Sequence, residues 1–117
     1  MAVLSVVNFT RAGTVIDGTG TILVDADAGG DEFANTGKEV FFVTNNSGGS
    51  ITVTLVFKPG INVDGQTPAN RTVTIVDGAI TVIGPFPNVN YNDTDGRMNV
   101  TYSDATDVTV AVMKLAT

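Results

Sequence analysis

The sequence predicts an all-β protein: a single-domain, antiparallel β-sandwich that is jelly-roll-like and has about eight short strands. Three observations lead to this prediction. Valine and threonine are frequent, whereas leucine, glutamate, lysine and glutamine, which favour helices, are sparse. Apolar and polar residues alternate in several short runs, as expected for strands with one buried face. Between these runs stand Asp-Gly turn signals, which begin at Asp17, Asp64, Asp77 and Asp95.

The clearest element is Arg71–Ile83, in which two apolar runs flank Asp77-Gly78. We expect a hairpin with a two-residue loop, because Asp-Gly is typical of such turns. In this register the large apolar residues share one face, while Thr74 and Thr81 share the other. The expected cross-strand pairs are Val76 with Ala79, Ile75 with Ile80, and Val73 with Val82.

A second hairpin is expected between Glu39–Asn45 and Ser50–Phe57, with its turn at residues 46–49. Gly48 supplies the left-handed position that a three-residue loop needs. The second of these strands alternates cleanly, with its apolar residues on one side and Ser50, Thr52 and Thr54 on the other. The apolar side consists of Ile51, Val53, Leu55 and Phe57, and the expected pairs are Val43 with Ile51 and Phe41 with Val53.

Four further strands are expected, at Val3–Thr10, Gly20–Asp25, Arg97–Ser103 and Val108–Leu115. The third of them turns Met98, Val100 and Tyr102 inward. The last strand has one apolar face, and its other face is only weakly polar, so we expect it to be covered on both sides. The apolar face is Val108, Val110 and Val112, and the weakly polar face is Thr109, Ala111 and Met113.

Three longer stretches, Ala26–Lys38, Lys58–Asn70 and Gly84–Gly96, are expected to be irregular, and loops of this length are often interaction surfaces. The last of them contains Pro85 and Pro87 on either side of Phe86. The two prolines exclude this segment from the middle of a sheet. Phe86 then either folds back into the core or is presented to a partner.

The 117 residues are expected to form one domain, with residues 1–12 as an N-terminal strand or arm and residues 13–117 as the sandwich. The first residues lack the basic and long apolar regions of a signal peptide. No apolar run approaches the ~20 residues that span a bilayer. We therefore expect synthesis in a cytoplasm and no membrane partner.

The composition argues against catalysis and against nucleic acid. The chain has no cysteine and no histidine, which removes thiolate metal sites, cysteine nucleophiles and the usual general base. Only six lysines and arginines stand against twelve acidic residues, for a net charge of −6, whereas phosphate binding needs basic side chains. We expect a protein that is not an enzyme and has no cofactor. The carboxylates of Asp104 and Asp107 are interpreted as ordinary turn residues.

The stretch from Asp25 to Glu32 is acidic, and Asp25, Asp27 and Asp31 offer the oxygen ligands that calcium prefers. The EF-hand pattern fails, because the fifth position is Gly29 and the twelfth is Thr36 in place of glutamate. The main interpretation is an acidic surface loop, and a weak calcium site is the alternative.

Several stretches together carry a family resemblance, and they follow one another between residues 25 and 115. They are residues 27–46, then Arg71–Ile75, Ile83–Pro87, Tyr91–Asp93 and Val100–Ser103. Their order resembles that of the small β-rich head decoration, or capsid cement, proteins of tailed bacteriophages. The first two dozen residues lie outside the resemblance.

The resemblance implies a structural virion protein that binds the outer surface of a phage capsid and cements neighbouring capsomers. It also implies a homotrimer, with the major capsid protein as partner. The alternative is a tail-fibre or baseplate module, or a module that binds host-surface carbohydrate. Exposed apolar segments are the candidate contacts with the capsid or with other subunits. These residues are Val3, Leu4, Val6, Phe33, Pro85, Phe86, Pro87 and Tyr91. The N-terminal stretch either adds a strand to a neighbour or forms an edge strand of its own sheet.

Overall fold

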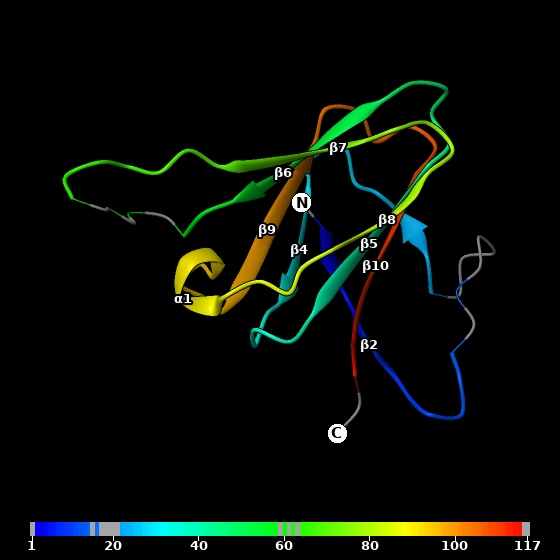
Figure 1. Ribbon diagram of the computed structural model, residues 1–117, viewed down its shortest axis with the longest axis horizontal. Helices are drawn as coiled ribbons and strands as arrows, with labels where there is room; N and C mark the ends of the chain where they lie inside the picture. Colours follow the sequence, from blue (N-terminus) through cyan, green and yellow to red (C-terminus); the bar gives the residue numbers. More distant parts are fainter. Residues whose placement is uncertain are drawn as a thin grey trace.

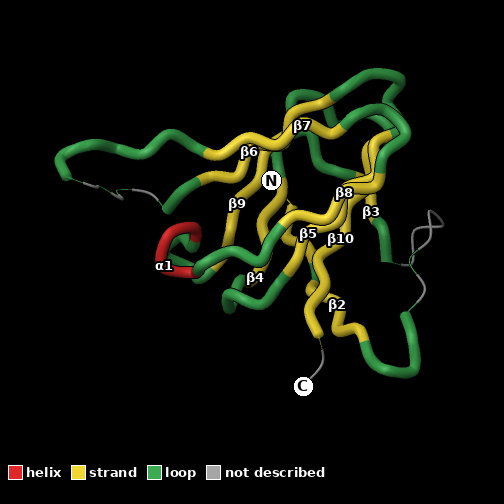
Figure 2. The backbone as a smooth tube through the Cα atoms, in the orientation of Figure 1, coloured by secondary structure: helices red, strands yellow, loops and turns green. Residues whose placement is uncertain are grey.

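The computed structural model describes residues 2–14, 16, 22–58, 60, 62 and 64–115 (Figure 1). Two β-sheets enclose one apolar core to which both contribute side chains. Within the described residues the one helix is α1 (Asn88–Tyr91), a single turn, and strands make up much of the backbone (Figure 2). The all-β sandwich expected from the sequence is therefore confirmed.

Each sheet has five strands. The first sheet has the order β1–β4–β9–β6–β7, and its strands are β1 (Ala2–Leu4), β4 (Asp31–Ala34), β9 (Arg97–Tyr102), β6 (Ile51–Val56) and β7 (Arg71–Ile75). The second sheet has the order β2–β10–β5–β8, and β3 also pairs with β10. Its strands are β2 (Val6–Phe9), β3 (Val24–Asp25), β10 (Val108–Leu115), β5 (Val40–Asn45) and β8 (Ile80–Ile83).

The sheets are mixed, which corrects the expectation of a purely antiparallel sandwich with about eight strands. The described residues form ten strands, and two of the strand pairs, β1 with β4 and β2 with β10, are parallel. The N-terminal member of each pair, β1 or β2, comes from residues 2–9. Within this segment the chain leaves the first sheet at Ser5 and enters the second. Alternation in a sequence reports which face of a strand is buried, but not which way its neighbour runs, so this feature was not predictable.

The predicted hairpin at Arg71–Ile83 is wrong in its pairing, although its turn is present. Ala79 donates its backbone N–H to the Val76 carbonyl across Asp77-Gly78, but β7 then pairs with β6 and β8 pairs with β5. Ile75 is fully buried, whereas Ile80 and Val82 are 66% and 55% exposed. The two apolar runs therefore do not share a face, and the turn carries the chain from one sheet to the other.

The second predicted hairpin is also wrong, because β5 and β6 lie in different sheets. The side chain of Asn45, which is completely buried, explains this crossing. Its amide nitrogen donates to the carbonyl oxygens of Gly49 (2.8 Å) and Ile75 (2.9 Å), and its Oδ1 accepts the backbone N–H of Ser47 (3.0 Å). Asn45 thus holds together the crossing from β5 to β6 and the end of β7. Gly48 has φ 92°, the left-handed conformation expected of it.

These pairings turn residues 40–83 into one long hairpin that is bent across the sandwich. One arm is β5 followed by β6, and the other is β7 followed by β8. The half near the tip thus contributes the pair β6–β7 to the first sheet, and the other half contributes the pair β5–β8 to the second. The hairpin's tip lies in residues 57–70, and the described part of the tip extends past the sheets on the left of Figure 1. The next crossing leads from β8 through α1 to β9.

The alternation predicted within single strands is confirmed. Ile51, Val53 and Leu55 are buried in the core, as are Met98 and Val100 on β9. Tyr102 and Phe57 are half-buried and pack against the same core. The prediction that the last strand is covered on both sides also holds for its central residues, since the inward Val108, Val110 and Val112 and the outward Ala111 and Met113 are all buried.

Two elements were not expected: β4, within the stretch taken as irregular, and α1. The sequence of β4, Asp-Glu-Phe-Ala, has a single large apolar residue and no alternation that would predict a strand. It forms because Phe33 enters the core and stacks on Phe41, with ring centroids 5.8 Å apart. Of the predicted strand Gly20–Asp25, only Val24 and Asp25 form β3, while residues 20 and 21 and the Asp17-Gly18 turn lie outside the described residues.

Candidate functional site

One side of the sandwich carries two strand edges that lack a neighbour. Among the described strands, β7 pairs only with β6, and β8 pairs only with β5. The short turn at Asp77-Gly78 joins the two strands, so both edges lie on the same side of the molecule, which we call the β7–β8 side. An unpaired edge presents backbone N–H and C=O groups that a further strand can bind.

Apolar side chains accompany these edges. Val76, Ile80 and Val82 are exposed on the turn and on β8, and residues 79–85 contain no charged side chain. Exposed apolar residues on an uncharged edge strand are typical of an interaction surface. The predicted hairpin register placed Ile80 and Val82 on one apolar face with Ile75 and Val73, and the sheet crossing explains why Ile80 and Val82 are exposed while Ile75 is buried.

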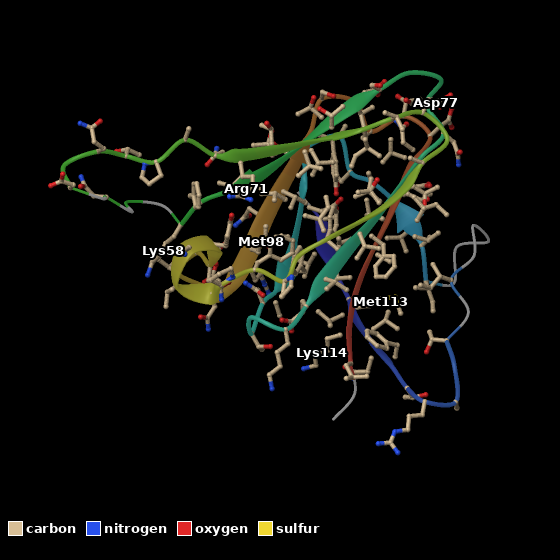
Figure 3. All side chains as sticks on the ribbon, in the orientation of Figure 1. Lys58, Arg71, Asp77, Met98, Met113 and Lys114 are labelled. Carbon is tan, nitrogen blue, oxygen red and sulfur yellow. The ribbon has the colours of Figure 1, made fainter. Side chains whose placement is uncertain are left out.

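A hollow of about 410 Å³ opens at one end of the β7–β8 side. It lies between the end of β6, the start of β7, the end of β8 and α1. Its lining includes Phe57, Arg71, Pro85, Pro87, Asn90 and Tyr91. Arg71 and Lys58 are labelled in Figure 3 near α1, and the backbone N–H of Lys58 donates to the carbonyl of Asn90 (2.8 Å).

The segment Gly84–Pro87 is held in place by Phe86, whose side chain is buried. The ring of Phe86 packs against Phe33 and meets Tyr91 edge-on, with ring centroids 6.1 and 5.8 Å away. Asn35 donates its side-chain amide to the Phe86 carbonyl (3.2 Å). Of the two alternatives for Phe86, the core is therefore confirmed, and Pro85 and Pro87 are left exposed on either side.

Two asparagines next to the Phe86 carbonyl form hydrogen bonds with each other. Asn35 donates to Oδ1 of Asn92 (2.7 Å), and Asn92 donates back to the carbonyl of Asn35 (2.7 Å). Asp93, beside them, accepts hydrogen bonds from the Asn99 side chain and from the backbone of Asp95 and Arg97. Burial raises the pKa of Asp93, but these hydrogen bonds and the Arg97 charge outweigh burial and lower it.

The candidate contact residues divide into two groups. Val3, Pro85 and Pro87 are exposed, and Val6 is half-buried. The other four are core side chains, which corrects their assignment as surface contacts, because a buried side chain has no free surface to offer. These four are Leu4, Phe33, Phe86 and Tyr91.

The N-terminal residues lie on the opposite side of the sandwich, which we call the β1–β2 side. Ala2–Leu4 pairs with β4 and Val6–Phe9 pairs with β10, so in this chain they are edge strands of its own two sheets. Leu4 fills part of the core, and Val3 points away from it.

The acidic stretch 25–32 differs from the surface loop that was expected. Asp31 begins β4, is fully buried, and accepts a hydrogen bond from the Tyr102 hydroxyl (2.6 Å). Asp27 caps its own turn through the backbone N–H of Gly29 (2.8 Å). No group of three or more acidic side chains in the described residues is placed to hold a metal ion. Asp104 likewise accepts the backbone N–H of Thr106 (2.9 Å) within a turn.

No family model matches the sequence, and no curated protein or solved structure matches it. The helix of the described residues, a single turn, is too short to cross a membrane.

Proposed function

We propose that this chain is a structural virion protein that binds the outer surface of a phage capsid and cements neighbouring capsomers. The observation that carries the proposal is the β7–β8 side, where two unpaired strand edges adjoin the exposed side chains of Val76, Ile80 and Val82. A cement protein acts through contact area, and the open edges with their exposed apolar side chains support such a role. The order of sequence stretches that resembles head decoration proteins supports the same proposal.

The charge of the chain suits such a position. A net charge of −6 keeps the protein soluble and repels the phosphates of nucleic acid. The outer surface of a head faces away from the packaged genome, so an acidic module bound there does not interfere with the DNA inside. The protein would be made in the cytoplasm of the bacterial host and would act on the virion.

The proposal includes a homotrimer that contacts the major capsid protein. Each copy then needs only a modest affinity, because three linked contacts raise the overall avidity without any new interaction. The exposed edge strands provide two separate surfaces, the β7–β8 side for the shell and the β1–β2 side for a neighbouring subunit.

A binding assay on heads tests the proposal. Heads purified from a phage strain that lacks this gene are mixed with the purified chain, sedimented and imaged by electron microscopy. We expect saturable binding to the outer surface and a higher temperature of head disruption. Failure of the chain to bind, or heads of equal heat resistance with and without it, would overturn the cementing role.

Two matched variants identify the surface. Val82 and Leu115 are 55% and 54% exposed and lie on β8 and β10 respectively. Val82→Glu should abolish binding to heads, because a carboxylate cannot enter an apolar contact without a partner. Leu115→Glu should bind as the wild type does. Light scattering of both variants checks that the trimer is formed.

The alternative, a tail-fibre, baseplate or host-surface carbohydrate-binding module, needs aromatic rings that sugars can stack on. Tyr91 is buried, and Tyr102 is half-buried and bonded to Asp31, so neither tyrosine offers a free face. A glycan array is the discriminating measurement. Specific glycan binding, together with no binding to heads, would replace the proposed function by this one.

A further inference from the structure

Resting on the function proposed above, we infer that the hollow beside Arg71 receives an extended, acidic segment of the shell protein. Three features of the hollow lead to this inference: an exposed arginine, Arg71, with no ion-pair partner among the described residues, a lining that includes the half-buried ring of Phe57 and two exposed prolines, and an open strand edge that begins at Arg71. Each of them specifies one property of the bound segment.

The first feature is charge. Arg71 lines the hollow, and Lys58 follows Phe57 in the chain, with its backbone N–H bonded to the carbonyl of Asn90. The one ion pair found among the described residues, Arg97 with Glu32, lies elsewhere, so neither cation is paired within that part of the chain. These are two of only six basic residues in a protein of net charge −6. A carboxylate is the partner that matches a guanidinium, through two parallel hydrogen bonds.

The second feature is the apolar lining. The half-buried ring of Phe57 stacks on the buried ring of Tyr91, with centroids 5.0 Å apart, and the exposed Pro85 and Pro87 also line the hollow. The volume of about 410 Å³ lies within the range of roughly 300–1,000 Å³ that is usual for ligand pockets. The hollow therefore has room for the apolar side chains of a peptide next to its carboxylate.

The third feature is the free edge of β7, which starts at the hollow. Its backbone groups on the side away from β6 have no partner among the described strands. An extended peptide can add to such an edge by main-chain hydrogen bonds, while the neighbouring pocket binds every second side chain of the peptide and so provides specificity. The bound segment is accordingly extended, with acidic and apolar residues alternating.

A pair of synthetic hexapeptides tests this inference directly. One alternates glutamate with leucine, and the other carries glutamine in place of each glutamate. Each is titrated into the full-length, ¹⁵N-labelled chain. We expect the acidic peptide to shift the backbone amide signals of Arg71, Ile83, Asn90 and Tyr91 saturably, and the glutamine peptide to bind at least about tenfold more weakly, because hydrogen bonds between charged groups are the strong ones.

Arg71→Gln and Arg11→Gln are the matched variants. Both remove one exposed arginine, but Arg11 follows β2, outside the hollow. Arg71→Gln should lower the affinity for the acidic peptide about tenfold or more, and Arg11→Gln should leave this affinity unchanged. Equal affinity of the two peptides, equal effects of the two variants, or signal shifts confined to other surfaces would each overturn the inference.

Further measurements separate this inference from its competitors. Shifts of the same amides that grow with protein concentration alone would identify a second copy of the chain as the occupant. Binding of galacturonate oligosaccharides without any response to the peptide would identify an acidic sugar. If the wild type binds heads and Arg71→Gln binds them equally well, the hollow is not the contact, although the cementing function stands. If the acidic peptide binds as expected but the chain does not bind heads, the proposed function fails and the inference about the hollow stands.

Discussion

The hydroxyl of Tyr102 donates a hydrogen bond of 2.6 Å to Oδ2 of Asp31, a carboxylate that is completely buried between the two sheets. The same oxygen accepts the backbone N–H of Asp27 at 3.3 Å, whereas Oδ1 has no partner among the described residues. A buried carboxylate with so few donors is costly, and Tyr102 provides its shortest hydrogen bond. Burial, this hydrogen bond and the charges of Asp31 and Asp27 raise the pKa of Tyr102 above its ordinary value.

Tyr102→Phe should therefore destabilise the protein by roughly 1.5–3 kcal/mol, the usual value of a hydrogen bond to a charged group. The measurement is urea-induced unfolding at pH 7. Tyr91→Phe is the matched control, because the Tyr91 hydroxyl makes no hydrogen bond among the described residues, and we expect it to change stability by less than about 0.5 kcal/mol. Equal losses in the two variants would contradict the role given to the Asp31 contact.

The raised pKa of Tyr102 also predicts a loss of stability in alkali. The folded state holds the Tyr102 proton more tightly than the unfolded state, whose tyrosine pKa is about 10. The stabilisation is thus complete below about pH 10 and declines as the pH rises above that value. Unfolding free energies between pH 8 and 11 should fall more steeply for the wild type than for Tyr102→Phe. Parallel curves would show that Tyr102 does not contribute to the alkaline transition.

The side chain of Asn45 forms hydrogen bonds in two crossings between the sheets, so its removal should destabilise both. Asn45→Ala removes the donors to Gly49 and Ile75 and leaves two carbonyls without them. We expect a loss of about 2–4 kcal/mol, from two hydrogen bonds of roughly 1–2 kcal/mol each. The neighbouring Asn46→Ala, at an exposed position, should cost less than about 0.5 kcal/mol. Denaturant midpoints measured under the same conditions compare the two.

The sequence predicted the faces of individual strands well because burial repeats every second residue. Ile51, Val53 and Leu55 are inside as expected, and so are Met98 and Val100. It did not predict which strands pair. The Asp77-Gly78 turn is compatible both with a hairpin and with a crossing between sheets, and the choice is made by tertiary contacts such as the buried amide of Asn45.

The candidate site was predicted only in part, for a related reason. Pro85 and Pro87 are exposed as proposed, since proline cannot occupy the middle of a sheet. Arg71 and Ile80 were assigned to a regular hairpin, and their place at an open edge follows from the sheet crossing. Phe33 was taken from a stretch interpreted as a loop, and it is buried because that stretch forms β4.

Gly84 should tolerate no side chain. Its φ is +122°, and a Cβ at this position would lie 3.1 Å from the Phe86 ring and 3.2 Å from the Glu39 carbonyl oxygen. Gly84→Ala should cost about 2–4 kcal/mol, from backbone strain of roughly 1–3 kcal/mol and the contact with main chain. Gly49→Ala is the control, because a Cβ at Gly49 meets nothing within 4 Å and its φ is ordinary. Thermal unfolding of both variants measures the difference, and similar melting temperatures would contradict this account.

Glu39, a nearly completely buried carboxylate just before β5, should contribute stability that depends on pH. It accepts the backbone N–H of Thr36 (2.7 Å), the Thr36 hydroxyl (3.0 Å) and the backbone N–H of Lys38 (3.1 Å). Burial alone would raise the pKa of Glu39, but these hydrogen bonds outweigh it and hold the pKa below its ordinary value. The folded state therefore releases this proton more readily than the unfolded state.

A lowered pKa means that the stabilisation is complete above the unfolded value of about 4.3 and is lost as the pH falls below it. Glu39→Gln should thus be less stable than the wild type by about 1–3 kcal/mol at pH 7, and the gap should close towards pH 2. Urea unfolding at pH 7, 5, 3 and 2 measures this gap. Asp95→Asn, at an exposed carboxylate that accepts no hydrogen bond among the described residues, should leave stability almost unchanged at pH 7. A gap between Glu39→Gln and the wild type that stays constant down to pH 2 would show that the loss comes from packing and not from the carboxylate charge.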